Sequence, residues 1–92
     1  MDNKKREERL TLKETRDKYF DKFRRNLRIL RASQDISGTE LSKKLKLKNG
    51  PRCIDLEYGR ANPKTEELIS ISSFFKIPID YLLAKDAKII FE

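Results

Sequence analysis

The feature that most constrains the fold is a break between two short amphipathic segments within residues 40–63. Apolar residues recur at helical spacing in each segment, and Asn49-Gly50-Pro51 between them predicts a turn. Helices this short are not stable alone, because nucleating a helix is costly and few residues repay it. We therefore expect two short helices that pack on the flanking sequence. Their inward positions are Leu41, Leu45, Cys53 and Leu56.

Three further helices are predicted around this pair. Thr11 and Glu14 match a capping box, and apolar residues continue at helical spacing to Leu30. This pattern predicts either one long helix or two helices joined near residues 17–21. Two shorter apolar patterns follow residue 63, with an inner stripe of Leu68, Ile69, Ile71, Ser72 and Phe75 and then Ile79, Leu82 and Leu83.

The ends of the two short helices have their own signals. Ser37 and Glu40 form a second capping box, which predicts a helix over 38–45. Pro51 suits the first turn of the next helix, because its missing N–H costs nothing there. Gly59 suits the left-handed residue that ends it.

Composition limits the classes of function that this chain can have. The 92 residues carry a formal net charge of +7, and residues 1–34 hold twelve Lys and Arg against six Asp and Glu. Such a field favours polyanions, among them nucleic acids, membrane surfaces and acidic proteins. One cysteine and no histidine argue against a disulfide within the chain, a zinc site and nucleophilic catalysis. We expect no enzyme, no cofactor and no metal.

No apolar run approaches the roughly 20 residues that span a bilayer, and the charged amino terminus lacks the apolar core of a signal peptide. We expect a soluble, cytoplasmic protein with no membrane partner. The predicted organisation is a basic extension (1–18), a helical domain (19–84) and a tail (85–92). The tail ends in Ile89-Ile90-Phe91-Glu92, which is either disordered, packed on the helices or paired with a second subunit.

Residues 20–83 resemble the phage lambda repressor and Cro family, the XRE-type helix-turn-helix. The most specific parts are Glu57-x-Gly59-x-x-x-Pro63 and the ending Ile77-Pro78-Ile79-Asp80-Tyr81-Leu82-Leu83. The resemblance implies an all-α, five-helix domain that binds double-stranded DNA, usually as a homodimer, with its second and third helices as the reading unit. It also implies a structural ion pair between Arg31 and Glu57.

The same resemblance places base-reading side chains on the helix around 51–58, although the turn is one residue longer than usual. Arg52 is expected to contact guanine O6 and N7, and Asn49 to pair with adenine or hold a phosphate. Asp55 is expected to accept from cytosine N4 or to orient Arg52. Ile54 touches either a thymine methyl group or another protein.

Seven residues are expected to contact the DNA backbone. Gly38 and Thr39 offer backbone N–H groups at a helix N-terminus, and Thr39 adds a hydroxyl. Tyr58 has the alternative role of covering Leu56, and Asn62 that of capping the fourth helix. The five remaining candidates are Lys43, Lys48, Tyr58, Arg60 and Asn62.

These features predict a sequence-specific transcriptional regulator, a repressor of a phage, mobile element or bacterial genome that occupies an operator. Gly38, Pro51, Asp55 and the enlarged turn favour an alternative, a protein-binding module on the same fold such as an antitoxin or adaptor. The basic extension either follows the minor groove, or lengthens the first helix, or keeps the protein soluble.

Overall fold

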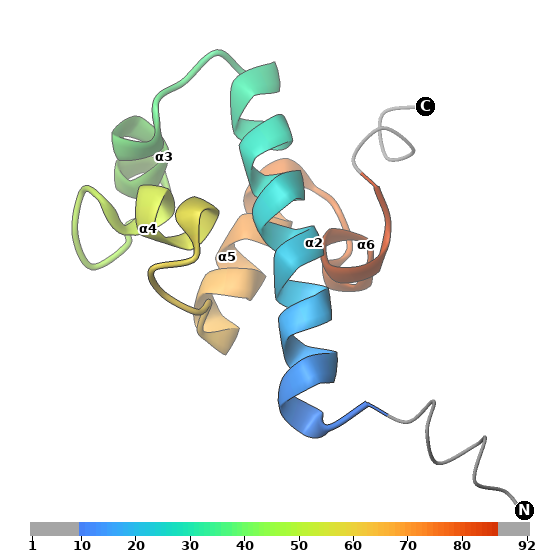
Figure 1. The fold of residues 1–92 in the computed structure, drawn as a ribbon. Helices are drawn as coiled ribbons and strands as arrows, with labels where there is room; N and C mark the ends of the chain where they lie inside the picture. The colour runs from blue at the N-terminus through green and yellow to red at the C-terminus, as the bar shows by residue number, and fades with distance from the viewer. Residues whose placement is uncertain (1–9, 87–92) are drawn as a thin grey trace, which may run out of the picture.

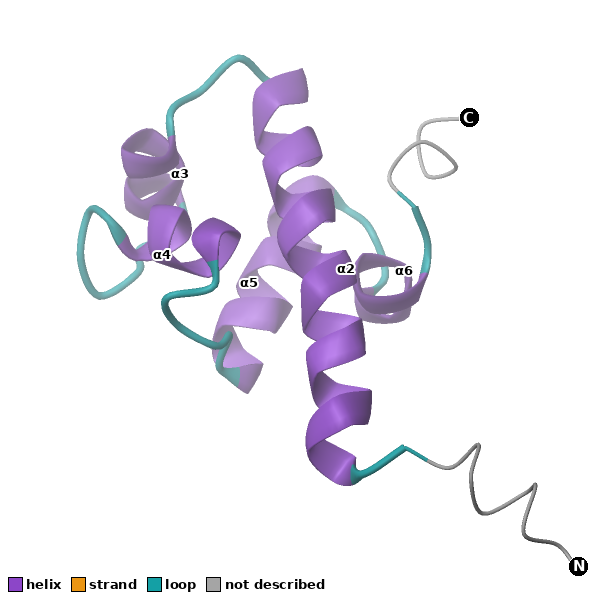
Figure 2. Cartoon of the chain, viewed as in Figure 1, coloured by secondary structure: helices purple, strands orange, loops and turns teal. Residues whose placement is uncertain are grey.

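The computed structural model describes residues 10–86, and within that range it contains five helices and no strand. Figure 1 shows the longest helix, α2, as a central rod with α3 and α4 on one side and α6 on the other, and Figure 2 shows short loops joining them. The expected all-α, five-helix class is confirmed. The helices are α2 (Leu12–Ser33), α3 (Gly38–Lys44), α4 (Arg52–Tyr58), α5 (Thr65–Phe75) and α6 (Ile79–Ala84).

The first helix is continuous. The Glu14 N–H donates to Thr11 Oγ1 at 3.0 Å, and the Thr11 N–H donates to Glu14 Oε1 at 2.8 Å, so the predicted capping box forms. Of the two sequence alternatives, one long helix is therefore correct, and the boundary proposed after residue 18 falls inside it. No residue in the first ten of α2 is buried.

The core is one cluster of buried apolar side chains to which every helix contributes. Helix α2 packs against α4 and α6, and α3 packs against α4. Ile69 was expected in this core, but its side chain is 54% exposed, so that part of the prediction is wrong. The buried members are Phe23, Leu27, Leu30, Leu41, Leu45, Cys53, Leu56, Ile71 and Leu82.

A buried amide fastens the end of α6 to α2. The side-chain nitrogen of Asn26 donates to the carbonyl oxygens of Leu82, at 2.9 Å, and Lys85, at 2.6 Å. The last carbonyls of a helix have no partner within it, and Asn26 supplies one from α2. This contact depends on tertiary packing and was not anticipated from the sequence.

Several helix ends differ from the prediction by one or two residues. Helix α3 ends at Lys44, because Leu45 is its C-cap, and α4 begins at Arg52, because Pro51 is its N-cap. Gly59 ends α4 with a φ of 81°, the left-handed conformation expected of it. Lys64, and not Asn62, is the N-cap of α5. The predicted role of the tail from Ile89 to Phe91 lies outside the described residues.

Candidate nucleic-acid interface

Two close contacts between α3 and α4 fix these helices against each other. A Cβ atom at Gly38 would lie 2.5 Å from Ile54 Cγ1, so any other residue there would force the Ile54 side chain to shift. The Ser42 hydroxyl accepts from the Cys53 N–H at 3.0 Å. Pro51 provides no side-chain cap to α4, and Ser42 satisfies one of the free N–H groups of its first turn instead.

Arg31 ties this pair of helices to α2. Its Nε donates to Glu57 Oε2 at 2.6 Å, its Nη2 to Glu57 Oε1 at 3.1 Å and its Nη1 to the Ile36 carbonyl at 2.9 Å. The Glu57 side chain is only 3% exposed, so the guanidinium neutralises a buried carboxylate. The hydrogen bonds to Glu57 raise the pKa of Arg31. The ion pair implied by the family resemblance is thus present in the structure.

Arg31 is one of three arginines that follow a single face of α2. Arg24, Arg28 and Arg31 are spaced i, i+4 and i+7, which places them on neighbouring turns of the same face. We call these three residues the arginine stripe. The spacing of these arginines can be read from the sequence. The contacts that each arginine makes cannot, because they depend on where α4 packs.

Arg24 closes the far end of α4. Its Nη1 donates to the carbonyl oxygens of Leu56, at 2.6 Å, and Ala61, at 2.9 Å, and its Nη2 donates to Asn62 Oδ1 at 2.8 Å. A cation at a helix C-terminus is favoured by the helix dipole as well as by these hydrogen bonds. Asn62 is therefore held by α2 and does not cap α5 as the sequence alternative had it.

Arg52 is not placed to read bases. Its Nε donates to Glu67 Oε2 at 2.6 Å, and its Nη2 donates to Glu67 Oε1 at 2.8 Å and to the Asn62 carbonyl at 3.1 Å. Its side chain is 17% exposed, and it joins α4 to α5 as Arg31 joins α4 to α2. The expected bidentate contact with guanine would require this ion pair to break, so we correct the assignment of Arg52 to a structural role.

The other two expected base readers on α4 also have partners inside the chain. Asp55 accepts from Arg60 Nε at 2.9 Å, so it orients Arg60 and not Arg52. Ile54 is half-buried against Gly38, which limits what its side chain can touch. Gly38 is itself buried, so Thr39 is the exposed residue of that turn.

The remaining predicted DNA contacts lie on the surface. Tyr58, at the last position of α4, has the guanidinium carbons of Arg28 and Arg60 at 5.5 and 5.1 Å from its ring centroid. Tyr58 is 66% exposed, so most of its surface is open to solvent. The exposed candidates are Thr39, Lys43, Lys48, Asn49, Tyr58, Arg60 and Asn62.

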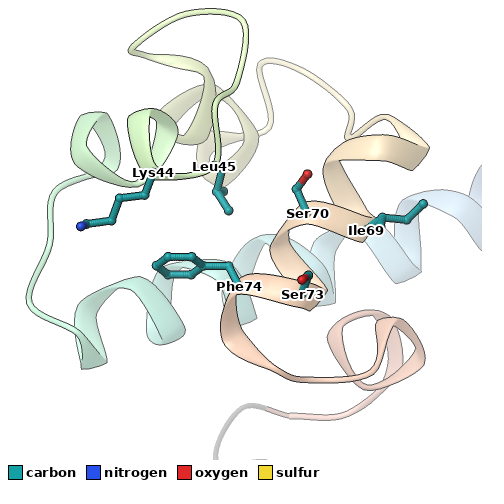
Figure 3. Close-up of a pocket in the computed structure, with 6 residues that line it drawn as sticks. All are labelled: Lys44, Leu45, Ile69, Ser70, Ser73 and Phe74. Atoms are coloured by element: carbon teal, nitrogen blue, oxygen red, sulfur yellow. The ribbon is translucent and has the colours of Figure 1, made fainter.

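A second surface feature lies between α3 and α5. It is an open hollow of about 370 Å³, and Figure 3 shows the end of α3 facing the side chains of α5 across it. Its lining residues are Lys44, Leu45, Ile69, Ser70, Ser73 and Phe74. The nearby Cys53 thiol is buried, and burial raises its pKa, so it stays a protonated core side chain.

Two further features are absent from the described part of the chain. None of its helices has the length and apolar character needed to cross a membrane. Residues 10–86 also contain no group of three or more His, Cys, Asp or Glu side chains that could hold a metal ion.

Comparison with known proteins gives one match. Among curated proteins and among solved structures, nothing matches this chain. The profile of a protein family described as helix-turn-helix matches residues 27–82, which run from the second half of α2 into α6 and contain the whole α3–α4 unit. The chain therefore belongs to the DNA-binding helix-turn-helix family, of the lambda repressor and Cro type.

Proposed function

We propose that this protein is a sequence-specific regulator that occupies an operator in double-stranded DNA as a homodimer and represses transcription. The observation that carries the proposal is the α3–α4 unit. Arg31 and Ser42 fix its position, and its outer surface presents polar and basic side chains with few partners in the described chain. A two-fold dimer would place two such units about 34–36 Å apart on one face of the duplex.

With Arg52 committed to Glu67, base reading rests on few side chains. Asn49 is exposed in the enlarged turn before α4, and its amide can donate to and accept from adenine in the major groove. Thr39, Lys43, Lys48 and Arg60 supply contacts to phosphates, which position the protein but carry no sequence information. We expect strong dependence on salt and selection at few base pairs.

Selection of preferred sites from random duplex DNA, followed by mobility shifts at low and moderate salt, tests this proposal. We expect one enriched motif with two-fold symmetry. Lys48→Ala should weaken binding to all sequences, whereas Asn49→Ala should relax the preference at one position of each half-site. Lys85→Ala, at an exposed site after α6, is the control and should bind as the wild type does. Uniform binding with no enriched motif would contradict sequence-specific reading.

A second candidate is a protein-binding module, an antitoxin or an adaptor. The observation that favours it is the depleted reading surface, because Arg52 is engaged, Gly38 is buried and Asp55 brings a negative charge to α4. The hollow between α3 and α5 offers a partner a mixed surface, with Leu45, Ile69 and Phe74 beside Lys44, Ser70 and Ser73. Absence of any retention of duplex DNA at low salt would favour this candidate over the first.

A further inference from the structure

Tyr58 and the two arginines beside it form a cluster at the C-terminal end of α4. Arg28 comes from the arginine stripe of α2, and Arg60 comes from the loop after α4, yet both guanidinium groups lie against the same tyrosine ring. Cations placed over an aromatic ring within about 6 Å are attracted by its electron-rich face. The ring therefore holds together two positive charges that would otherwise repel each other.

Both guanidinium groups keep donors available. Arg28 is 53% exposed and approaches Glu57 only to 3.8 Å, so it makes no hydrogen bond within the described residues. Arg60 is 59% exposed and uses its Nε for Asp55, which leaves its two terminal nitrogens without a partner in that range. Guanidinium N–H groups in this fork arrangement match the oxygens of a phosphate.

The local charge is positive even though carboxylates are present. Arg24 and Arg31 supply two more guanidinium groups, and within residues 10–86 the carboxylates paired with the cluster are those of Asp55 and Glu57. Glu57 is buried and already paired with Arg31. An anion at the Tyr58 ring would therefore face a net positive surface.

We propose that Arg28, Tyr58 and Arg60 form a clamp for a backbone phosphate of duplex DNA, with Tyr58 as the platform that positions the two arginines. This inference rests on the proposed function and deepens it, because it adds Arg28 of α2 as a DNA contact. Tyr58 then acts through its ring, and its hydroxyl is not required. The clamp fixes the C-terminal end of α4 on the duplex while the turn before α4 meets the bases.

The test measures the affinity of the full chain for its selected duplex at several salt concentrations from about 50 to 200 mM. Arg28→Gln should weaken binding severalfold and lower the slope of log affinity against log salt by about one unit, as should Arg60→Gln. Arg25→Gln is the matched control on the same helix, because Arg25 lies near Asp86 and is not part of the arginine stripe. It should leave the slope unchanged.

Two tyrosine variants separate the platform from the hydroxyl. Tyr58→Phe should bind like the wild type, and Tyr58→Leu should lose affinity with a melting temperature close to that of Tyr58→Phe. The clamp would be overturned by an unchanged salt slope in both arginine variants, or by an equal loss of affinity in both tyrosine variants. In either case, binding of DNA by the wild type would still support the proposed function. Failure of the wild type to bind DNA would overturn both.

Discussion

Arg31 and Arg52 make nearly the same contact, although the sequence predicted a structural ion pair for Arg31 and base reading for Arg52. Each places its guanidinium in a bidentate pair with a glutamate of low exposure, Glu57 in one case and Glu67 in the other. Burial raises the pKa of Glu67, but hydrogen bonds from Arg52 and from the Lys64 N–H outweigh it, so that its pKa lies below the ordinary value. The Arg52–Glu67 pair therefore holds ionised groups that stabilise the folded chain.

Arg31→Ala should damage folding before it damages recognition. The variant leaves Glu57 buried with only the Arg28 guanidinium, whose Nε lies 3.8 Å from Glu57 Oε1, and removing one partner of a buried ion pair costs about 3–5 kcal/mol. For a domain of this size we expect the melting temperature to fall by more than about 10 °C. Circular dichroism during heating measures it. An unchanged midpoint together with lost DNA binding would show that Arg31 is a contact residue.

Arg52 and Glu67 should show strong coupling in a double-mutant cycle. Arg52→Met and Glu67→Gln should each destabilise the chain by about 1.5–3 kcal/mol, because each leaves a hydrogen-bonded ionic partner unsatisfied. The double variant should lose clearly less than the sum of the single losses. Urea denaturation gives all four free energies of unfolding. A relaxed base preference in Arg52→Met at unchanged stability would restore the base-reading role that the structure argues against.

The elements of this fold were predictable where their signals are local. The capping boxes at Thr11 and Ser37, the turn at Gly50 and the left-handed Gly59 each act within a few residues, and each is present in the structure. The partners of Arg24, Asn26 and Arg52 lie between 10 and 59 residues away along the chain, and no local pattern specifies them.

The candidate site was predictable only in part for the same reason. Its exposed lysines and Asn49 follow from helical spacing and turn chemistry. The engagement of Arg52 depends on how α5 packs against α4, which the alternation of polar and apolar residues does not determine. Arg28 was missed because an arginine on a charged helix face looks like a solvated residue until Tyr58 is placed beside it.

The close approach of α3 and α4 gives a prediction for this pair of elements. Gly38→Ala should destabilise the chain by about 1–3 kcal/mol, because the new methyl group would overlap the branched Ile54 side chain. Ile54→Ala removes the obstacle. Gly38→Ala should therefore destabilise the Ile54→Ala variant much less than it destabilises the wild type. Gly50→Ala is the control, since its Cβ would meet only Thr39 Cγ2, at 3.4 Å. Equal losses in both backgrounds would contradict a steric cause.

Over the whole molecule, the net positive charge lies in the first 60 residues of the chain. Residues 1–60 hold eighteen Lys and Arg against ten Asp and Glu, whereas residues 61–92 hold four against five. The positive field therefore comes mainly from α2, which holds eight Lys and Arg against three Asp and Glu and carries the arginine stripe. Such a field speeds encounter with DNA at low salt and weakens as salt screens it.

The acid stability of the whole domain should depend measurably on Glu67. The lowered pKa of this carboxyl means that the unfolded chain binds its proton more readily, so the contribution to stability is present above about pH 4.3 and is lost as pH falls through the folded-state pKa. Glu67→Gln should be clearly less stable than the wild type at neutral pH, and the gap should close in acid. Glu66→Gln, at the exposed neighbouring position, should show no gap. Urea denaturation across this pH range measures both, and a Glu67→Gln deficit that stays constant into acid would mean that packing, and not the charge of Glu67, links α4 to α5.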